Sequence, residues 1–205
     1  MAPPSEGLRE RRRRETQREI HAAVLRLGRK HEFDKITVEM ISVEAGISPR
    51  TFFNYFPSKE SAAILQTPAE WSPDLVEPFV AGGRGRPAEV LADLNRMLIE
   101  HLARNPPRRQ ESHDVFELAH RAPTVFAALM NQFDTLRVAL TDLVRRRLGP
   151  HADPQLPDLI ASVAMAAVRT GMESWSQGTD DSPVPYVQHA AALLHAVLAD
   201  PESSR

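Results

Sequence analysis

Cysteine is absent from the 205 residues of this chain, and this absence excludes several kinds of chemistry at once. Without thiols there is no disulfide framework, no cysteine-ligated zinc, no iron–sulfur cluster and no thiol nucleophile. No apolar run approaches the roughly 18–20 residues that cross a bilayer. The first residues also lack the apolar segment of a secretory signal. We therefore expect a soluble, cytoplasmic protein without a membrane partner.

Recognisable catalytic and metal-binding patterns are missing as well. The sequence has no Gly-x-Ser-x-Gly, no His-Glu-x-x-His and no phosphate-cradling glycine loop. His113 and His120 are seven residues apart, and His189 and His195 are six apart. Neither spacing is the i, i+4 pairing that places two imidazoles on one helix face. We expect no enzyme activity, no metal site and no cofactor.

Lysine is scarce, and its distribution reveals a charge asymmetry within a net charge of −2. All three lysines lie in the first 60 residues, which hold 12 basic and 9 acidic residues; the rest holds 13 basic and 18 acidic. A basic first third suggests a polyanionic partner. The run Arg11–Arg14 either contacts phosphates or a minor groove, or is a solvated start of a helix.

Alternating strand patterns are missing throughout, whereas apolar residues recur at helical spacing. This spacing predicts a buried stripe of Ile20, Ala23, Val24 and Leu27, and a buried face of Val38, Ile41 and Ala45 on the next helix. The sequence predicts an all-α fold of about nine helices. Four prolines and three glycines in residues 66–87 indicate a broken stretch with at most short helices. We expect one domain over residues 9–60 and a second over residues 61–205. The expected helices lie near residues 9–28, 38–45, 49–55, 59–65, 88–104, 113–121, 123–148, 158–177 and 186–198.

Residues 37–59 carry the strongest functional signal. Thr37 is a plausible N-cap, Gly46 permits a left-handed turn, and Ser48-Pro49 restarts a helix. Two short helices joined by a tight glycine turn form a helix-turn-helix, whose second helix enters the major groove of DNA. We expect Phe52 and Phe56 to pack in the core. The candidates for base edges are Ser48, Pro49, Arg50, Thr51 and Asn54, and those for phosphates are Thr37, Tyr55 and Lys59.

The run AGISPRTFFNYFPSKE resembles the recognition-helix signature of TetR-type (TetR/AcrR) transcriptional regulators. The matching residues are Ala45-Gly46-Ile47-Ser48, Thr51, Phe52, Tyr55-Phe56 and Lys59. Phe53 departs from the pattern, because the family most often has tyrosine there, and phenylalanine lacks the hydroxyl that usually binds a phosphate. Phe53 either packs in the core or rests on the DNA backbone.

The resemblance implies a homodimeric, ligand-responsive repressor that reads a palindromic operator. It also implies that the last two helices form a four-helix bundle with the partner copy. Small residues on these helices suit close packing, and larger apolar residues add area. The small ones are Ser162, Ala164, Ala166, Ala167, Ala190, Ala191, Ala192 and Ala196, and the larger ones are Leu159, Ile160, Val163, Val168, Leu193, Leu194, Val197 and Leu198. A structural role within one chain is the alternative. Activation instead of repression, and an α-helical binding module or enzyme with a structural helix-turn-helix, remain open.

A small, apolar effector, with or without a polar end, would bind among the central helices. Aromatic and methionine side chains with a few polar groups are typical of such a pocket, although most side chains of these types simply form core. The candidates are Met97, His101, Phe116, Phe126, Met130, Asn131, Phe133, Met165, Arg169, Met172 and Trp175.

Overall fold

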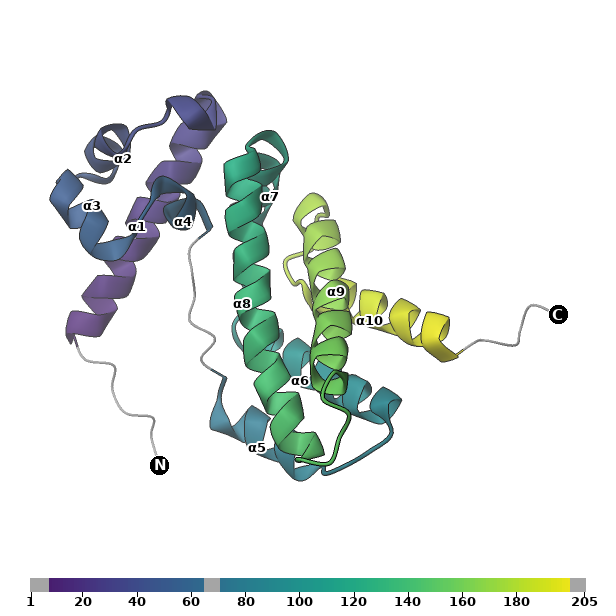
Figure 1. The fold of residues 1–205 in the computed structure, drawn as a ribbon. Coiled ribbons are helices and arrows are strands. Elements are labelled where there is room, and N and C mark those ends of the chain that lie inside the picture. The colour runs from purple at the N-terminus through teal and green to yellow at the C-terminus, as the bar shows by residue number, and fades with distance from the viewer. Residues whose placement is uncertain (1–7, 65–70, 200–205) are drawn as a thin grey trace. The chain divides into compact units, whose positions relative to one another are not determined.

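The computed structural model describes residues 8–64 and 71–199. These residues form ten α-helices and one short 3-10 helix, and they contain no strand (Figure 1). The predicted all-α fold is therefore confirmed. The helices are α1 (Leu8–Lys30), η1 (Phe33–Lys35), α2 (Val38–Ala45), α3 (Pro49–Tyr55), α4 (Lys59–Ile64), α5 (Pro73–Ala81), α6 (Pro87–Arg104), α7 (Arg109–Arg121), α8 (Pro123–Leu148), α9 (Leu156–Gln177) and α10 (Val184–Ala199).

Helix α5 is a short helix within residues 66–87, where the sequence pattern allowed short helices but did not place one. Pro73 stands in its first turn, where a missing N–H costs nothing, and Pro78 lies inside the helix. Leu75, Val76 and Phe79 are all buried, so burial of this apolar face offsets the hydrogen bond that Pro78 cannot make. The later helices also begin two to four residues earlier than predicted, at Arg109, Leu156 and Val184.

The chain divides into two compact units, which are described separately. The first comprises α1 to α4 together with residues 114–132, and the second comprises residues 68–113 and 133–205. The expected domain boundary near residue 60 stays a prediction. We call the described residues 8–64 of the first unit the head.

The core of the head is built on one face of α1. Ile20, Ala23, Val24 and Leu27, the apolar stripe expected from their spacing, are all buried. Helices α2 and α4 both pack against α1, and α3 packs against α2. The long first helix is therefore the scaffold on which the two short helices of the helix-turn-helix are held.

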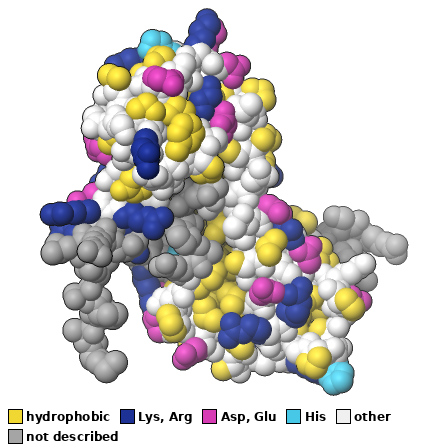
Figure 2. All heavy atoms as spheres, turned by 60° about the vertical axis from the view of Figure 1, so that its left-hand side comes forward, with side chains coloured by type: hydrophobic (Ala, Val, Ile, Leu, Met, Phe, Trp, Pro, Cys, Tyr) yellow, Lys and Arg dark blue, Asp and Glu magenta, His cyan; other side chains and the backbone are white. Residues whose placement is uncertain are grey.

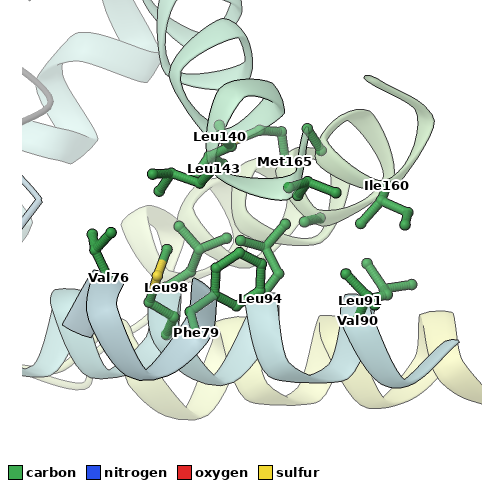
Figure 3. Close-up of a cluster of buried hydrophobic side chains, with 14 of the residues drawn as sticks. Val76, Phe79, Val90, Leu91, Leu94, Leu98, Leu140, Leu143, Ile160 and Met165 are labelled. Carbon is green, nitrogen blue, oxygen red and sulfur yellow. The ribbon is translucent and has the colours of Figure 1, made fainter. Parts of the chain in front are cut away.

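The second unit has its own apolar core between α5, α6, α8 and α9 (Figure 3). Phe79 and Leu98 come from the two earlier helices, and Leu140 and Met165 from the two later ones. Helix α10 packs mainly on α9 and also on α6. Gly171 marks a close approach of α9 and α10, because a Cβ placed there would lie 2.6 Å from the Cα of Val187.

Candidate nucleic-acid interface

Local hydrogen bonds define both helices of the helix-turn-helix. The hydroxyl of Thr37 accepts from the Met40 N–H at 3.2 Å at the start of α2, and the hydroxyl of Ser48 accepts from the Thr51 N–H at 3.1 Å at the start of α3. Between them, Gly46 ends α2 with a φ of 68°. A left-handed residue at this point is most easily a glycine. The predicted caps and turn are confirmed.

Helix α3 separates a buried side from an exposed side. Phe52 and Phe56 are buried as predicted, with their ring centroids 6.1 Å apart. Arg50, Phe53 and Asn54, at i, i+3 and i+4, lie on the other side and are exposed; Pro49 is exposed too. The Phe53 side chain is 58% exposed, so it does not pack in the core, and its contact with the DNA backbone stays a prediction.

The remaining predicted DNA contacts differ in their exposure. Ser48 and Thr37 are exposed, whereas Thr51 and Tyr55 are half-buried. The hydroxyl groups of Ser48 and Thr51 lie 2.9 Å apart, so in the free protein they bond to each other. Figure 2, with this side of the chain turned forward, shows exposed hydrophobic side chains among separate charged ones.

Lys59 is oriented differently from a surface cation. Its Nζ donates to the carbonyl oxygens of Phe33 at 2.8 Å and Ile36 at 2.9 Å, and it lies 3.4 Å from the carbonyl of Asp34. The ammonium also lies 4.7 Å from the centre of the Phe33 ring. Its predicted contact with a phosphate stays a prediction, but the structure directs the charge toward the protein.

The arginine run lies within α1, because this helix already begins at Leu8. Arg11–Arg14 are all exposed, and Arg11 pairs with Glu15 at 3.2 Å. Successive helical residues point about 100° apart, so the four guanidinium groups spread around the helix. In the described residues the run is thus no extended arm, and both of its predicted roles, phosphate contact and solvated helix start, stay open.

Two features near the turn were missed by the sequence analysis. Val43 on α2 is 83% exposed, although its spacing gave no reason to single it out. Its neighbour Glu44 accepts a hydrogen bond from Arg26 Nε at 2.7 Å, and this bond lowers the pKa of the Glu44 carboxyl. Arg26 thereby ties α1 to the end of α2 and partly neutralises an acidic group beside the turn.

The predicted effector-binding residues are divided between the two units. In the first, Phe116 is buried, Met130 is half-buried, and Phe126 and Asn131 are exposed. In the second, Met97 and Met165 belong to the apolar core, and Trp175 is fully buried with its Nε1 donating to the Asp180 carbonyl at 2.9 Å. The others in that unit are His101, Phe133 and Met172, half-buried, and Arg169, exposed.

Trp71 is a further candidate that the sequence analysis missed. Its ring centroid lies 4.8 Å from that of His101 in the second unit. The ring nitrogens Trp71 Nε1 and His101 Nδ1 are both buried without a hydrogen-bond partner among the described residues. Burial also lowers the pKa of His101, which favours the neutral imidazole. Trp71 lies within the broken stretch 66–87, so no helical spacing pointed to it.

Other kinds of site find little support in the described part of the chain. It has no group of three or more metal-ligating His, Asp or Glu side chains, and none of its helices is long and apolar enough to cross a membrane. The first unit has a cavity of about 410 Å³ at the end of α1, which none of the predicted effector residues lines.

Helices α9 and α10 carry exposed apolar side chains in addition to the buried ones that join them. Leu159 on α9 is 59% exposed, and Leu193 and Val197 on α10 are 55% and 77% exposed. Ala164, Ala167 and Ala191 are buried. Large apolar side chains left at a surface often mark a contact with another protein.

The helix-turn-helix with its exposed strip defines a DNA-binding protein of the regulatory class, and comparison with known families agrees. Residues 20–61 match the bacterial regulatory proteins of the tetR family, and residues 88–199, more than half of the chain, match the MftR C-terminal domain. The chain therefore belongs to the TetR family of DNA-binding transcriptional regulators. Members of this family are regulators rather than enzymes.

Individual relatives are distant. The HTH-type transcriptional regulator TcmR of Streptomyces glaucescens is 27% identical over 182 residues, which cover 84% of this chain and 78% of that protein. FadR of Thermus thermophilus, a TetR-family repressor solved in complex with lauroyl-CoA, is 24% identical; the match covers 92% of this chain and 98% of FadR, with a TM-score of 0.47. A TetR-like regulator from Rhodococcus sp. RHA1 is 17% identical, covers 93% and 97%, and has a TM-score of 0.45.

Proposed function

We propose that the chain is a homodimeric repressor that reads a palindromic operator through α3 and is released by a small, apolar effector. The observation that carries the proposal is the two-sided character of α3. Buried Phe52 fixes the helix to the head, and Arg50, Phe53 and Asn54 are left exposed on the other side. A helix held in this way presents its side chains to the edges of bases in the major groove.

Each exposed residue of α3 has a distinct proposed role. Arg50 can bind guanine through two hydrogen bonds and Asn54 can bind adenine in the same way, each contributing about 1–3 kcal/mol of discrimination. Ser48, Pro49 and Thr51 form the end of the helix that approaches the bases. Phe53 has no hydroxyl, so its contact with DNA is apolar. Thr37 and Tyr55 supply hydroxyl groups for phosphates.

The size of the head supports a symmetric dimer. One recognition helix reads only a few base pairs, whereas two heads related by a two-fold axis read both halves of a palindrome. We place the contact between the copies on α9 and α10. The exposed Leu159, Leu193 and Val197 support this choice, because they would be covered in the dimer.

The effector site is proposed in the second unit, beside Trp71 and His101. Trp71 packs against the apolar core, which suits a largely apolar ligand. The unpartnered ring nitrogens of both residues could bond to one polar group of that ligand, because buried polar groups without partners are costly. Phe133 and Met172, which are half-buried, remain candidates for its apolar contacts.

Operator binding is tested with duplexes selected from a random library by the full-length protein, followed by affinity measurements. Arg50→Ala should weaken binding and relax the preference at one base pair of each half-site. Tyr55→Phe should weaken binding uniformly across sequences. Arg86→Ala removes an exposed arginine directly before α6 and serves as the matched control, with no expected effect on operator binding. Failure of the wild-type protein to select any duplex sequence would reject the proposal.

The effector is tested separately, on the protein–duplex complex. A panel of small apolar compounds, with and without a polar end, is screened for thermal stabilisation of the protein and release of the selected duplex. His101→Leu should abolish or weaken the response to any active compound while leaving operator affinity unchanged. If His101→Leu is stabilised and releases the duplex as fully as the wild-type protein, the effector binds at another site.

A further inference from the structure

Lys59 stands at the first position of α4, but its side chain reaches back to the turn between α1 and α2. An ammonium group has three N–H donors. In this structure three carbonyl oxygens, those of Phe33, Asp34 and Ile36, lie within 2.8–3.4 Å of Nζ. The ring of Phe33 adds an attractive contact with the cation. All the donors of the group therefore have partners within the protein.

The turn held by Lys59 leads directly into the helix-turn-helix. Phe33 and Ile36 are buried, with 4% and 1% of their surface exposed, and Ile36 precedes Thr37, the residue that caps α2. Lys59 itself follows α3 after three residues. One side chain thus connects the segment before the helix-turn-helix to the segment after it.

Contact with a phosphate would require the ammonium to give up these partners. Hydrogen bonds to a charged group stabilise more than neutral ones, and the ammonium would give up its bonds to the Phe33 and Ile36 carbonyls at 2.8 Å and 2.9 Å. A phosphate at the surface of DNA would have to compensate for both. The geometry favours an ammonium that stays in place when DNA binds.

We propose that Lys59 is a positioning residue for operator binding, which fixes the turn 33–36 and thereby the start of α2, and that its charge does not neutralise a DNA phosphate. This inference rests on the operator binding proposed above. It assigns the lysine of the TetR-type signature a different role in this chain from the phosphate contact that the sequence led us to expect.

The test compares Lys59→Met and Lys59→Arg with Lys35→Met. Lys35 lies in the turn 33–36 that Lys59 contacts, is 73% exposed and pairs with Glu32. Lys35→Met therefore removes one positive charge from this turn but leaves the carbonyl contacts of Lys59 intact. Affinity for the selected duplex is measured at several salt concentrations, together with the melting temperature. If each of the two heads no longer neutralised one phosphate, the slope of log K against log salt would fall by about 1.8.

A positioning role predicts that Lys59→Met binds about tenfold or more weakly at every salt concentration, with an unchanged slope and a lowered melting temperature. Lys59→Arg should be impaired in the same way, because a planar guanidinium cannot direct three donors to carbonyls that converge on one point. Lys35→Met should change affinity and melting temperature little. A normal affinity of Lys59→Arg, combined with a slope reduced by about 1.8 in Lys59→Met, would overturn the proposal.

A measurement on the wild-type protein covers the case in which the variants do not fold. The ammonium nitrogen signal of Lys59 in NMR spectra should be protected from rapid proton exchange in the free protein and should keep its chemical shift when the duplex is added. A signal that is unprotected, or that shifts on DNA binding, counts against the positioning role. If wild-type protein selects no duplex, operator binding fails, while proton exchange still decides whether the carbonyl contacts of Lys59 exist in solution.

Discussion

Two helical glycines provide a matched test of how closely the helices pack. A Cβ at Gly171 would lie 2.6 Å from the Cα and 2.8 Å from the backbone N of Val187 in α10. A Cβ at Gly28 of α1 would instead lie 3.1 Å and 3.2 Å from the two terminal methyl groups of Leu118. The same substitution, Gly→Ala, therefore meets backbone at one position and the end of a flexible side chain at the other.

The expected free energies of unfolding follow from two opposing effects. Alanine is favoured over glycine within a helix by about 1 kcal/mol. Overpacking costs about 1–3 kcal/mol, and we take the upper half of this range for Gly171, since the Val187 backbone must move by about 1 Å. Gly171→Ala should therefore be destabilised by about 1–2 kcal/mol, whereas Gly28→Ala should be neutral or stabilised by up to about 1 kcal/mol.

Urea unfolding at a fixed protein concentration measures these differences, since the stability of a dimer depends on concentration. For a chain of this size, the destabilisation of Gly171→Ala corresponds to a melting temperature about 2–8 °C lower. Sedimentation should also show weaker dimerisation, because α9 and α10 are the proposed contact between copies. A Gly171→Ala protein as stable as wild type, or less affected than Gly28→Ala, would refute the reasoning from close approach.

Three further predictions concern the head. Replacing Arg11, Arg12 and Arg13 with glutamine should lower the slope of log K against log salt by about 0.9 for each phosphate that the variant no longer neutralises; an unchanged slope would indicate a solvated helix start. Phe52→Ala should lower the free energy of unfolding by about 3–5 kcal/mol in urea titrations, because Phe52 is fully buried, and a decrease below about 1 kcal/mol would contradict that burial. Glu44→Gln should be less stable than wild type at neutral pH, with a difference that disappears on acidification. The reason is that Arg26 lowers the pKa of Glu44, so the stabilisation is present above the ordinary pKa of a glutamate and is lost as the pH falls through the lowered value. A difference that persists in acid would exclude this ion pair as its cause.

Features that depend on neighbouring residues could be predicted from the sequence. The caps at Thr37 and Ser48 and the left-handed Gly46 depend on hydrogen bonds within a few residues and on backbone conformation, and all three are confirmed. The apolar stripe of α1 could be predicted for the same reason, because helical spacing alone places Ile20 and Val24 on one face.

Features that depend on tertiary packing could not be predicted. The pattern in α2 favoured Val38, Ile41 and Ala45 as the buried face, but the structure buries Ile41 and Ser42 and leaves the other two half-buried. The three carbonyl partners of Lys59 lie 23–26 residues earlier in the chain, and no spacing rule connects them. Helix α5 could not be placed within residues 66–87, because burial of Leu75, Val76 and Phe79 offsets the cost of the internal Pro78.

The two tryptophans differ in a way that gives this chain a built-in optical reporter. Trp175 is fully buried and its indole N–H is bonded to Asp180, so its fluorescence should respond little to small ligands. Trp71 is half-buried beside His101, and its indole N–H has no partner among the described residues. A molecule that bonds to this N–H would change the emission of Trp71 directly. In a Trp175→Phe variant, occupancy of the proposed effector site could therefore be followed by the fluorescence of Trp71, without a label and without DNA.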